Sequence, residues 1–141
     1  MGNRAVITTK ANFRNNGVGV YIHWCGGRDR VEAFLIYMKL REFRPPERDC
    51  YGWARLCQVI GNYFGGGLSI GIDTIDNLDA DNYDNGVYII ENWQIVGREH
   101  FSGAEQTGID LKEMLREIDL CQPVSDRLGR DFLKEWKGAQ L

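Results

Sequence analysis

This sequence is short of the residues and patterns that mark several large classes of protein. It has 2 histidines and 3 prolines, and its formal net charge is −3 with a pI of about 5.4. Because a basic surface normally supplies most of the affinity for long DNA or RNA, the acidic balance argues against that class of partner. The few prolines and the 43% of hydrophobic residues argue against a disordered chain.

Long hydrophobic runs are also missing. No run approaches the roughly 20 apolar residues that a membrane-spanning helix needs. The N-terminal stretch MGNRAVITTK has no apolar segment of the kind found in signal peptides, and Val6 stands where a myristoylation motif has serine or threonine. We therefore expect a cytosolic protein with no membrane partner. No two of the four cysteines form a C-x-x-C pair, and we expect them to stay reduced.

Metal ligands are sparse as well. His23 and His100 lie far apart, and the cysteines are scattered, so no zinc-ligand spacing is present. The acidic stretch 74–86 does not fit an EF-hand, because a loop that began at Asp79 would place Asp84 where a glycine belongs. We expect neither a metal nor another cofactor, and we interpret the acidic stretch as a solvated loop.

The hydrophobic pattern predicts a single α+β domain over 1–141. Four β-branched runs predict strands at 4–9, 19–24, 68–73 and 87–97. We expect the first two to form one hairpin and the last two to form another, with the acidic loop between them. Apolar residues at helical spacing predict two central helices, at about 29–41 and 49–64. The expected core is a small antiparallel sheet with these two helices beside it.

The last third of the chain predicts an amphipathic helix pair at 109–120 and 125–136, separated by Pro123. We expect an α+β ligand-binding core at 1–103 and a C-terminal helical dimerisation segment at 104–141. The apolar faces of the pair could fold back on the sheet or dock on another subunit, and the pattern favours neither.

The segment HWCGGRDR (23–30) is the strongest candidate site. Its two glycines, including Gly27, allow a tight turn that exposes backbone N–H groups. A helix that starts with Asp29 as its N-cap would present the positive end of its dipole there. Arg28 and Arg30 add planar donors that suit phosphate. The segment therefore predicts an anion-binding turn, in which Gly27 and Arg28 contact the ligand.

One alternative for this segment remains open. Cys25 could be a nucleophile activated by His23 and the nearby arginines, although the second cysteine of a thioredoxin motif is replaced by Arg28. Exposed rings at turns, such as Trp24 and Tyr83, support the anion-binding interpretation, because flat aromatic faces beside arginines suit a nucleobase with its phosphates. No motif places an acid, a base and a nucleophile together, so the sequence favours a binding protein that is not an enzyme.

Three long runs resemble the phage anti-Thoeris signal-sponge proteins: GVGVYIHWCGGRDRVEAFL, YGWARLCQVIGNYFGGGLSIGID and DNGVYIIENWQIVGRE, within about 17–99. The resemblance implies a protein that binds glycocyclic ADP-ribose, the immune signal of bacterial TIR-domain enzymes, without cleaving it. Some members also bind the cyclic di- and trinucleotides of CBASS defence at a separate site. The implied fold is an antiparallel β-core whose C-terminal helices interlock between protomers, giving homodimers that assemble into hexamers.

The resemblance also implies a set of ligand-binding residues. The pocket would be lined by Trp24, Arg28, Tyr83 and Asn92, with Arg116 reaching in from a second protomer. Arg55 and Arg98 are weaker candidates, assigned to the second site. Two further functions stay open, an enzyme that processes such nucleotides and a phage protein-interaction module.

Overall fold

The fold is described from a computed structural model, which covers residues 2–129 and 132–133. The strands are β1 Ala5–Thr9, β2 Val18–Ile22, β3 Ile70–Thr74, β4 Val87–Glu91 and β5 Gln94–Glu99. The helices are α1 Lys10–Arg14, α2 Arg28–Leu40, α3 Tyr51–Phe64 and α4 Leu111–Cys121, with short 3₁₀ turns at Ile75–Asn77 and Val124–Asp126. The predicted α+β class and both central helices are confirmed.

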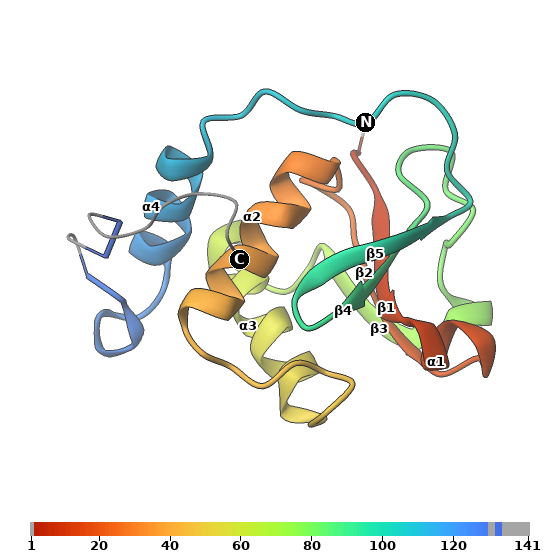
Figure 1. The fold of residues 1–141 in the computed structure, drawn as a ribbon, viewed down its shortest axis with the longest axis horizontal. Helices are drawn as coiled ribbons and strands as arrows, with labels where there is room; N and C mark the ends of the chain where they lie inside the picture. Colours follow the sequence, from red (N-terminus) through yellow and green to blue (C-terminus); the bar gives the residue numbers. More distant parts are fainter. Residues whose placement is uncertain (1, 130–131, 134–141) are drawn as a thin grey trace.

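The strands form one sheet in the order β3-β2-β1-β4-β5 (Figure 1). The first predicted hairpin is confirmed, since β1 pairs antiparallel with β2 and Ile7 faces Val20. However, β1 also pairs parallel with β4, so the sheet is mixed rather than wholly antiparallel. All five residues of β1 are buried, as expected for the central strand of a sheet covered on both faces.

The second predicted hairpin is wrong. The strand β3 pairs with β2 at one edge of the sheet, whereas β4 lies on the other side of β1. The burial of the strands accounts for this order. In β4, Val87 to Ile90 are all buried, which suits a position beside the central strand, while the residues of β3 are half-buried or exposed, as at an edge.

The segment predicted as one strand at 87–97 is itself a tight hairpin. It reverses at Asn92 and Trp93, whose φ angles are +50° and +60°. Two consecutive positive φ angles are typical of the type I′ turn, whose twist matches that of paired strands. Trp93 is 3% exposed, and its indole N–H donates to the carbonyl oxygen of Phe43 at 2.7 Å. The buried ring thus ties the hairpin to the loop after α2.

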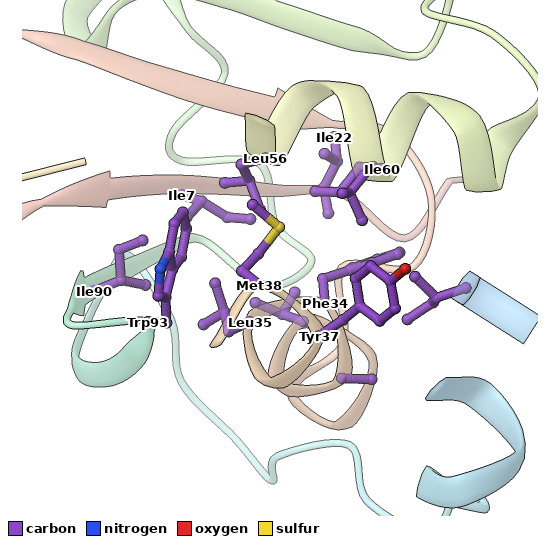
Figure 2. Close-up of a cluster of buried hydrophobic side chains, with 14 of the residues drawn as sticks. Ile7, Ile22, Phe34, Leu35, Tyr37, Met38, Leu56, Ile60, Ile90 and Trp93 are labelled. Atoms are coloured by element: carbon purple, nitrogen blue, oxygen red, sulfur yellow. The ribbon is translucent and has the colours of Figure 1, made fainter. Parts of the chain in front are cut away.

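The main core lies between one face of the sheet and the helices α2, α3 and α4 (Figure 1). Figure 2 shows Ile7 and Ile90 of the sheet facing Leu35 and Met38 of α2. A smaller cluster on the opposite face packs Val6, Val87 and Ile89 against the loop after β3. Because neighbouring strand residues point to opposite faces, β1 contributes to both clusters.

The C-terminal third joins this same core. Met114, Leu115 and Ile118 of α4 are buried in the cluster that α2 and α3 also line, so the apolar face of α4 folds back within the chain. The second predicted helix, 125–136, is not found where the chain is described: a 3₁₀ turn spans 124–126, and Arg127 is extended. Its positions 130–131 and 134–136 lie outside the described residues. None of the helices described is long and apolar enough to cross a membrane.

A buried carboxylate fixes the end of α4. Asp119 is 3% exposed, accepts a hydrogen bond of 2.5 Å from the Tyr37 hydroxyl of α2, and accepts two more from the backbone N–H groups of Leu128 and Gly129. Burial raises the pKa of Tyr37, and its hydrogen bond to Asp119 raises it further. Asp119 therefore links α2, α4 and the segment that follows α4.

Replacing Asp119 should destabilise the protein strongly. Asp119→Ala leaves one hydroxyl and two backbone amides without their acceptor, and we expect a loss of about 3 kcal/mol in the free energy of unfolding. Urea unfolding measures this loss. Glu113→Ala, on the exposed side of the same helix, should change the free energy by less than about 0.5 kcal/mol. Equal effects of the two substitutions would contradict the role of Asp119.

Candidate anion-binding site at the start of α2

The predicted turn at 23–30 does lead into a helix, but the helix starts differently from expectation. Gly27, not Asp29, is the N-cap of α2. The predicted capping box is therefore wrong: Asp29 lies in the first turn, where its carboxylate accepts from the N–H of Arg30 at 2.8 Å, and Glu32 pairs with Arg28 instead. The preceding glycine, Gly26, donates its N–H to the carbonyl oxygen of Asn3.

A segment far along the chain covers the start of α2. We call residues 101–110, which connect β5 to α4 without regular secondary structure, the strap (Figure 1). The carbonyl oxygen of Gln106 accepts a hydrogen bond of 3.1 Å from the N–H of Asp29. A Cβ atom on Gly27 would lie 2.4 Å from Oε1 of Gln106, so a larger residue at this position would force the Gln106 side chain to shift. The strap thus accepts a hydrogen bond from a backbone N–H group at the helix start, where the sequence predicted a bound phosphate.

The strap also places a carboxylate between two arginines. Glu105 pairs with Arg28 of α2 at 2.9 Å and with Arg98 of β5 at 2.5 Å. Arg28 makes a further ion pair of 2.7 Å with Glu32, one helical turn along α2. The two arginines that converge here are therefore the predicted candidates Arg28 and Arg98, and the anion between them is part of the chain.

Arg98 is the more rigidly held of the pair. Its side chain is 12% exposed, and its guanidinium carbon lies 3.9 Å from the ring centroid of Tyr88 and 3.8 Å from that of Phe101. One terminal nitrogen donates to the carbonyl oxygen of Asn85. The buried Nε has no hydrogen-bond partner among the described residues. Stacking between two rings leaves the edge of the guanidinium directed at an anion.

The two arginines control the ionisation of Glu105. Burial raises the pKa of this carboxyl group, but the hydrogen bonds from Arg98 and Arg28 outweigh that effect and hold the pKa below its usual range. Glu105 is therefore a carboxylate at neutral pH.

A cavity of about 260 Å³ opens beside Arg28. Its polar side is formed by Arg28 and Glu32 of α2 with Gln94 of β5, and its walls are apolar. The wall residues come from α2 and from the β4–β5 hairpin: Leu35, Ile36, Trp93 and Ile95. Arg28 thus belongs both to the ion-pair cluster and to the rim of an apolar hollow.

The remaining predicted residues lie elsewhere. Trp24 is 43% exposed, and its ring meets His23 edge-on at 4.7 Å. Tyr83 is 91% exposed in the polar loop, and Asn92 lies at the turn of the β4–β5 hairpin. Arg116 is exposed on α4 and pairs with Glu113. Within the described part of the chain, none of these four residues lines the cavity beside Arg28.

Arg55 lies in a second hollow, apart from Arg98. Its guanidinium carbon is 5.4 Å from the ring centroid of Phe43, and that of Arg41 is 4.9 Å from the same centroid. This hollow, of about 340 Å³, is completed by Gln58, Val59, Gln122 and Asp126. The two weaker candidates, Arg55 and Arg98, therefore belong to two different places in this chain.

The environment of Cys25 argues against a reactive thiolate. Arg30 lowers the pKa of the Cys25 thiol, as expected, but burial raises it by more, so the pKa lies above its usual value. Nδ1 of His23 is 2.8 Å from the hydroxyl oxygen of Tyr21, so one of its two ring nitrogens is already hydrogen-bonded.

The residues that sequence reasoning missed are Glu105 and Gln106 of the strap. No motif marks FSGAEQTG, and Glu105 contacts Arg28 across 77 positions of sequence. The one available indication was the pair of glycines, Gly103 and Gly108, that brackets them.

The described residues contain no group of three or more histidine, cysteine, aspartate or glutamate side chains that could hold a metal ion. Comparisons with models of protein families, with curated proteins and with solved structures found no match to this chain.

The ion pairs of Glu105 should make stability depend on pH. Because the folded-state pKa is depressed, their contribution is present above the unfolded-state pKa of about 4.3 and is lost as the pH falls through the folded-state value. Glu105→Gln should therefore cost about 1–2 kcal/mol at pH 7, and this difference from the parent protein should shrink below about pH 4. Urea unfolding at both pH values measures it. A difference that stays constant with pH would contradict the assignment.

Proposed function

We propose that this chain binds a small cyclic nucleotide signal, in the first place glycocyclic ADP-ribose, and holds it without cleaving it in the bacterial cytosol. The observation that carries the proposal is the position of Arg28, which lies both in a converging arginine pair and on the rim of an apolar cavity. The resemblance of 17–99 to phage signal-sponge proteins supports the same function. The cyclic di- and trinucleotides are proposed as further ligands.

The arginine pair suits the phosphates of such a ligand, and the apolar cavity suits its bases and riboses. The oxygens of a diphosphate can accept hydrogen bonds from the planar guanidinium groups of Arg28 and Arg98, which already hold a carboxylate between them. The apolar walls formed by Leu35, Ile36 and Ile95 suit the faces of a base or a ribose. Recognition then combines charge with buried apolar contact.

The size of the cavity supports a site completed by a second protomer. Sites that enclose a drug-sized ligand measure about 300–1,000 Å³, and the cavity here is about 260 Å³. We therefore propose a homodimer, assembled further into a hexamer, in which another protomer closes the pocket. Arg116, exposed on α4, is the residue proposed to reach across.

Binding without turnover agrees with the chemistry of the candidate nucleophile. The raised pKa of Cys25 keeps the thiol protonated at neutral pH, and His23 is hydrogen-bonded to Tyr21 rather than to a nucleophile. A nucleotide-processing enzyme and a protein-interaction module are the alternatives that the binding experiment separates.

Calorimetry with glycocyclic ADP-ribose tests the proposal. A protein that must outcompete a receptor should bind with nanomolar affinity, on the order of −12 kcal/mol. After heat denaturation of the complex, chromatography should recover the ligand intact. Recovery of an altered ligand would identify an enzyme. The absence of binding, both to this ligand and to cyclic di- and trinucleotides, would contradict the function.

Arg28→Ala should weaken this binding by at least about 2 kcal/mol, or roughly 30-fold, because a desolvated phosphate loses a charged partner. Arg44→Ala is the matched control, since Arg44 makes one exposed ion pair with Asp49 away from the cavity. The same calorimetric titration measures both variants. Equal affinities of the two would place the ligand elsewhere in the protein.

A further inference from the structure

The carboxylate of Glu105 lies where the proposed function requires an anion of the ligand. It accepts hydrogen bonds from Arg28 and Arg98, and the strap that carries it also covers the start of α2 through Gln106. We propose that Glu105 is an internal competitor, which occupies the anion position between the two arginines and is displaced, together with residues 103–108 of the strap, when a diphosphate binds. This inference rests on the proposed function for the identity of the natural ligand.

The arginine pair is built to hold an anion in either state. Arg98 is fixed between the rings of Tyr88 and Phe101, so its guanidinium keeps its position when the carboxylate leaves. One of its terminal nitrogens donates to both carboxylate oxygens of Glu105, a bifurcated charge-assisted contact that two oxygens of a phosphate can also accept. The exchange of Glu105 for a phosphate therefore replaces one set of charge-assisted hydrogen bonds by a similar set.

The strap is constructed so that it can move. Gly103 and Gly108 have φ angles of +102° and +109°, and a Cβ atom on either would meet no other atom within 4 Å. Its residues 102–104 and 106–108 are exposed. Segments with few buried contacts open at low free-energy cost. The strap is tied to the α2 site through Glu105 and Gln106, so loss of those ties frees it between two glycine hinges.

The competitor makes the site selective for charge. A ligand must replace the ion pairs of Glu105 before it gains its own, so its apparent affinity is reduced by the fraction of molecules in which the site is closed. A monoanion such as acetate offers no more than Glu105 already supplies. A diphosphate carries more charge and more acceptor oxygens, and it can therefore displace the carboxylate.

Pyrophosphate is the probe that tests this competition directly. Calorimetry at constant ionic strength compares the parent protein with Glu105→Gln, in which the side chain at position 105 loses its charge but keeps nearly the same shape. We expect the variant to bind pyrophosphate at least about tenfold more tightly, because the closed state is weakened. Asp79→Asn removes the same charge from an exposed pair with Arg4, away from the arginine pair and the cavity, and should leave the affinity unchanged. Equal affinity of the parent protein and Glu105→Gln would overturn the proposal.

Hydrogen exchange on the parent protein gives a second readout that needs no variant. Pyrophosphate should accelerate exchange at the Asp29 amide, which donates to Gln106 in the closed state, and at the amides of the strap. The amide of Gln122 at the end of α4, which donates to Asp119, should not change. Bound pyrophosphate with unchanged exchange at Asp29 would overturn the displacement of the strap.

The outcomes also separate this inference from the proposed function. If Glu105→Gln gains affinity for pyrophosphate but neither protein binds glycocyclic ADP-ribose, the competitor stands and the proposed ligand is wrong. If glycocyclic ADP-ribose binds the parent protein tightly and Glu105→Gln changes neither affinity, the proposed function stands and the competitor is overturned.

Discussion

The parallel pairing of β1 with β4 is the constraint on which the rest of the structure depends. It places β4 beside the fully buried central strand and sends the tight hairpin at Asn92 and Trp93 outward, so that β5 becomes an edge of the sheet. Arg98 on that edge is thereby brought to the start of α2, near Arg28. In the antiparallel arrangement expected from the sequence, β4 would have paired with β3, and these two arginines would have had no reason to meet.

Two carboxylates then attach the C-terminal third to this frame, in different ways. Asp119 is almost fully buried and satisfied by a hydroxyl and two backbone amides, so its loss leaves several orphaned donors. Glu105 is more exposed and is held by the side chains of two arginines, which a competing anion can take over. The contacts of Asp119 fix α4 in the core. Those of Glu105 hold the strap, which can be released while the rest of the fold stays intact.

Sequence reasoning succeeded where structure is decided locally. The helical spacing of Val31, Phe34 and Met38 predicted α2, and the three glycines after Phe64 correctly ended α3. It failed where distant segments choose each other: strand order depends on which strand is buried on both faces, and a reversal at Asn-Trp carries no glycine. In the site, Arg28 was found from its local motif. Its partner Glu105, 77 positions away, follows only from the fold.

The occupied state of the anion site has a simple energetic reason. Two arginines that converge on one point repel each other, and Arg98 is mostly removed from water, so a site left empty would carry an uncompensated buried charge. Glu105 removes that cost and holds the two arginines around a single anion position. This arrangement lowers the apparent affinity for any ligand, because the ligand must first displace the carboxylate. For the proposed function, which requires tight retention of a ligand, that loss is acceptable if the released strap leaves the ligand in contact with both arginines and with the apolar cavity beside Arg28.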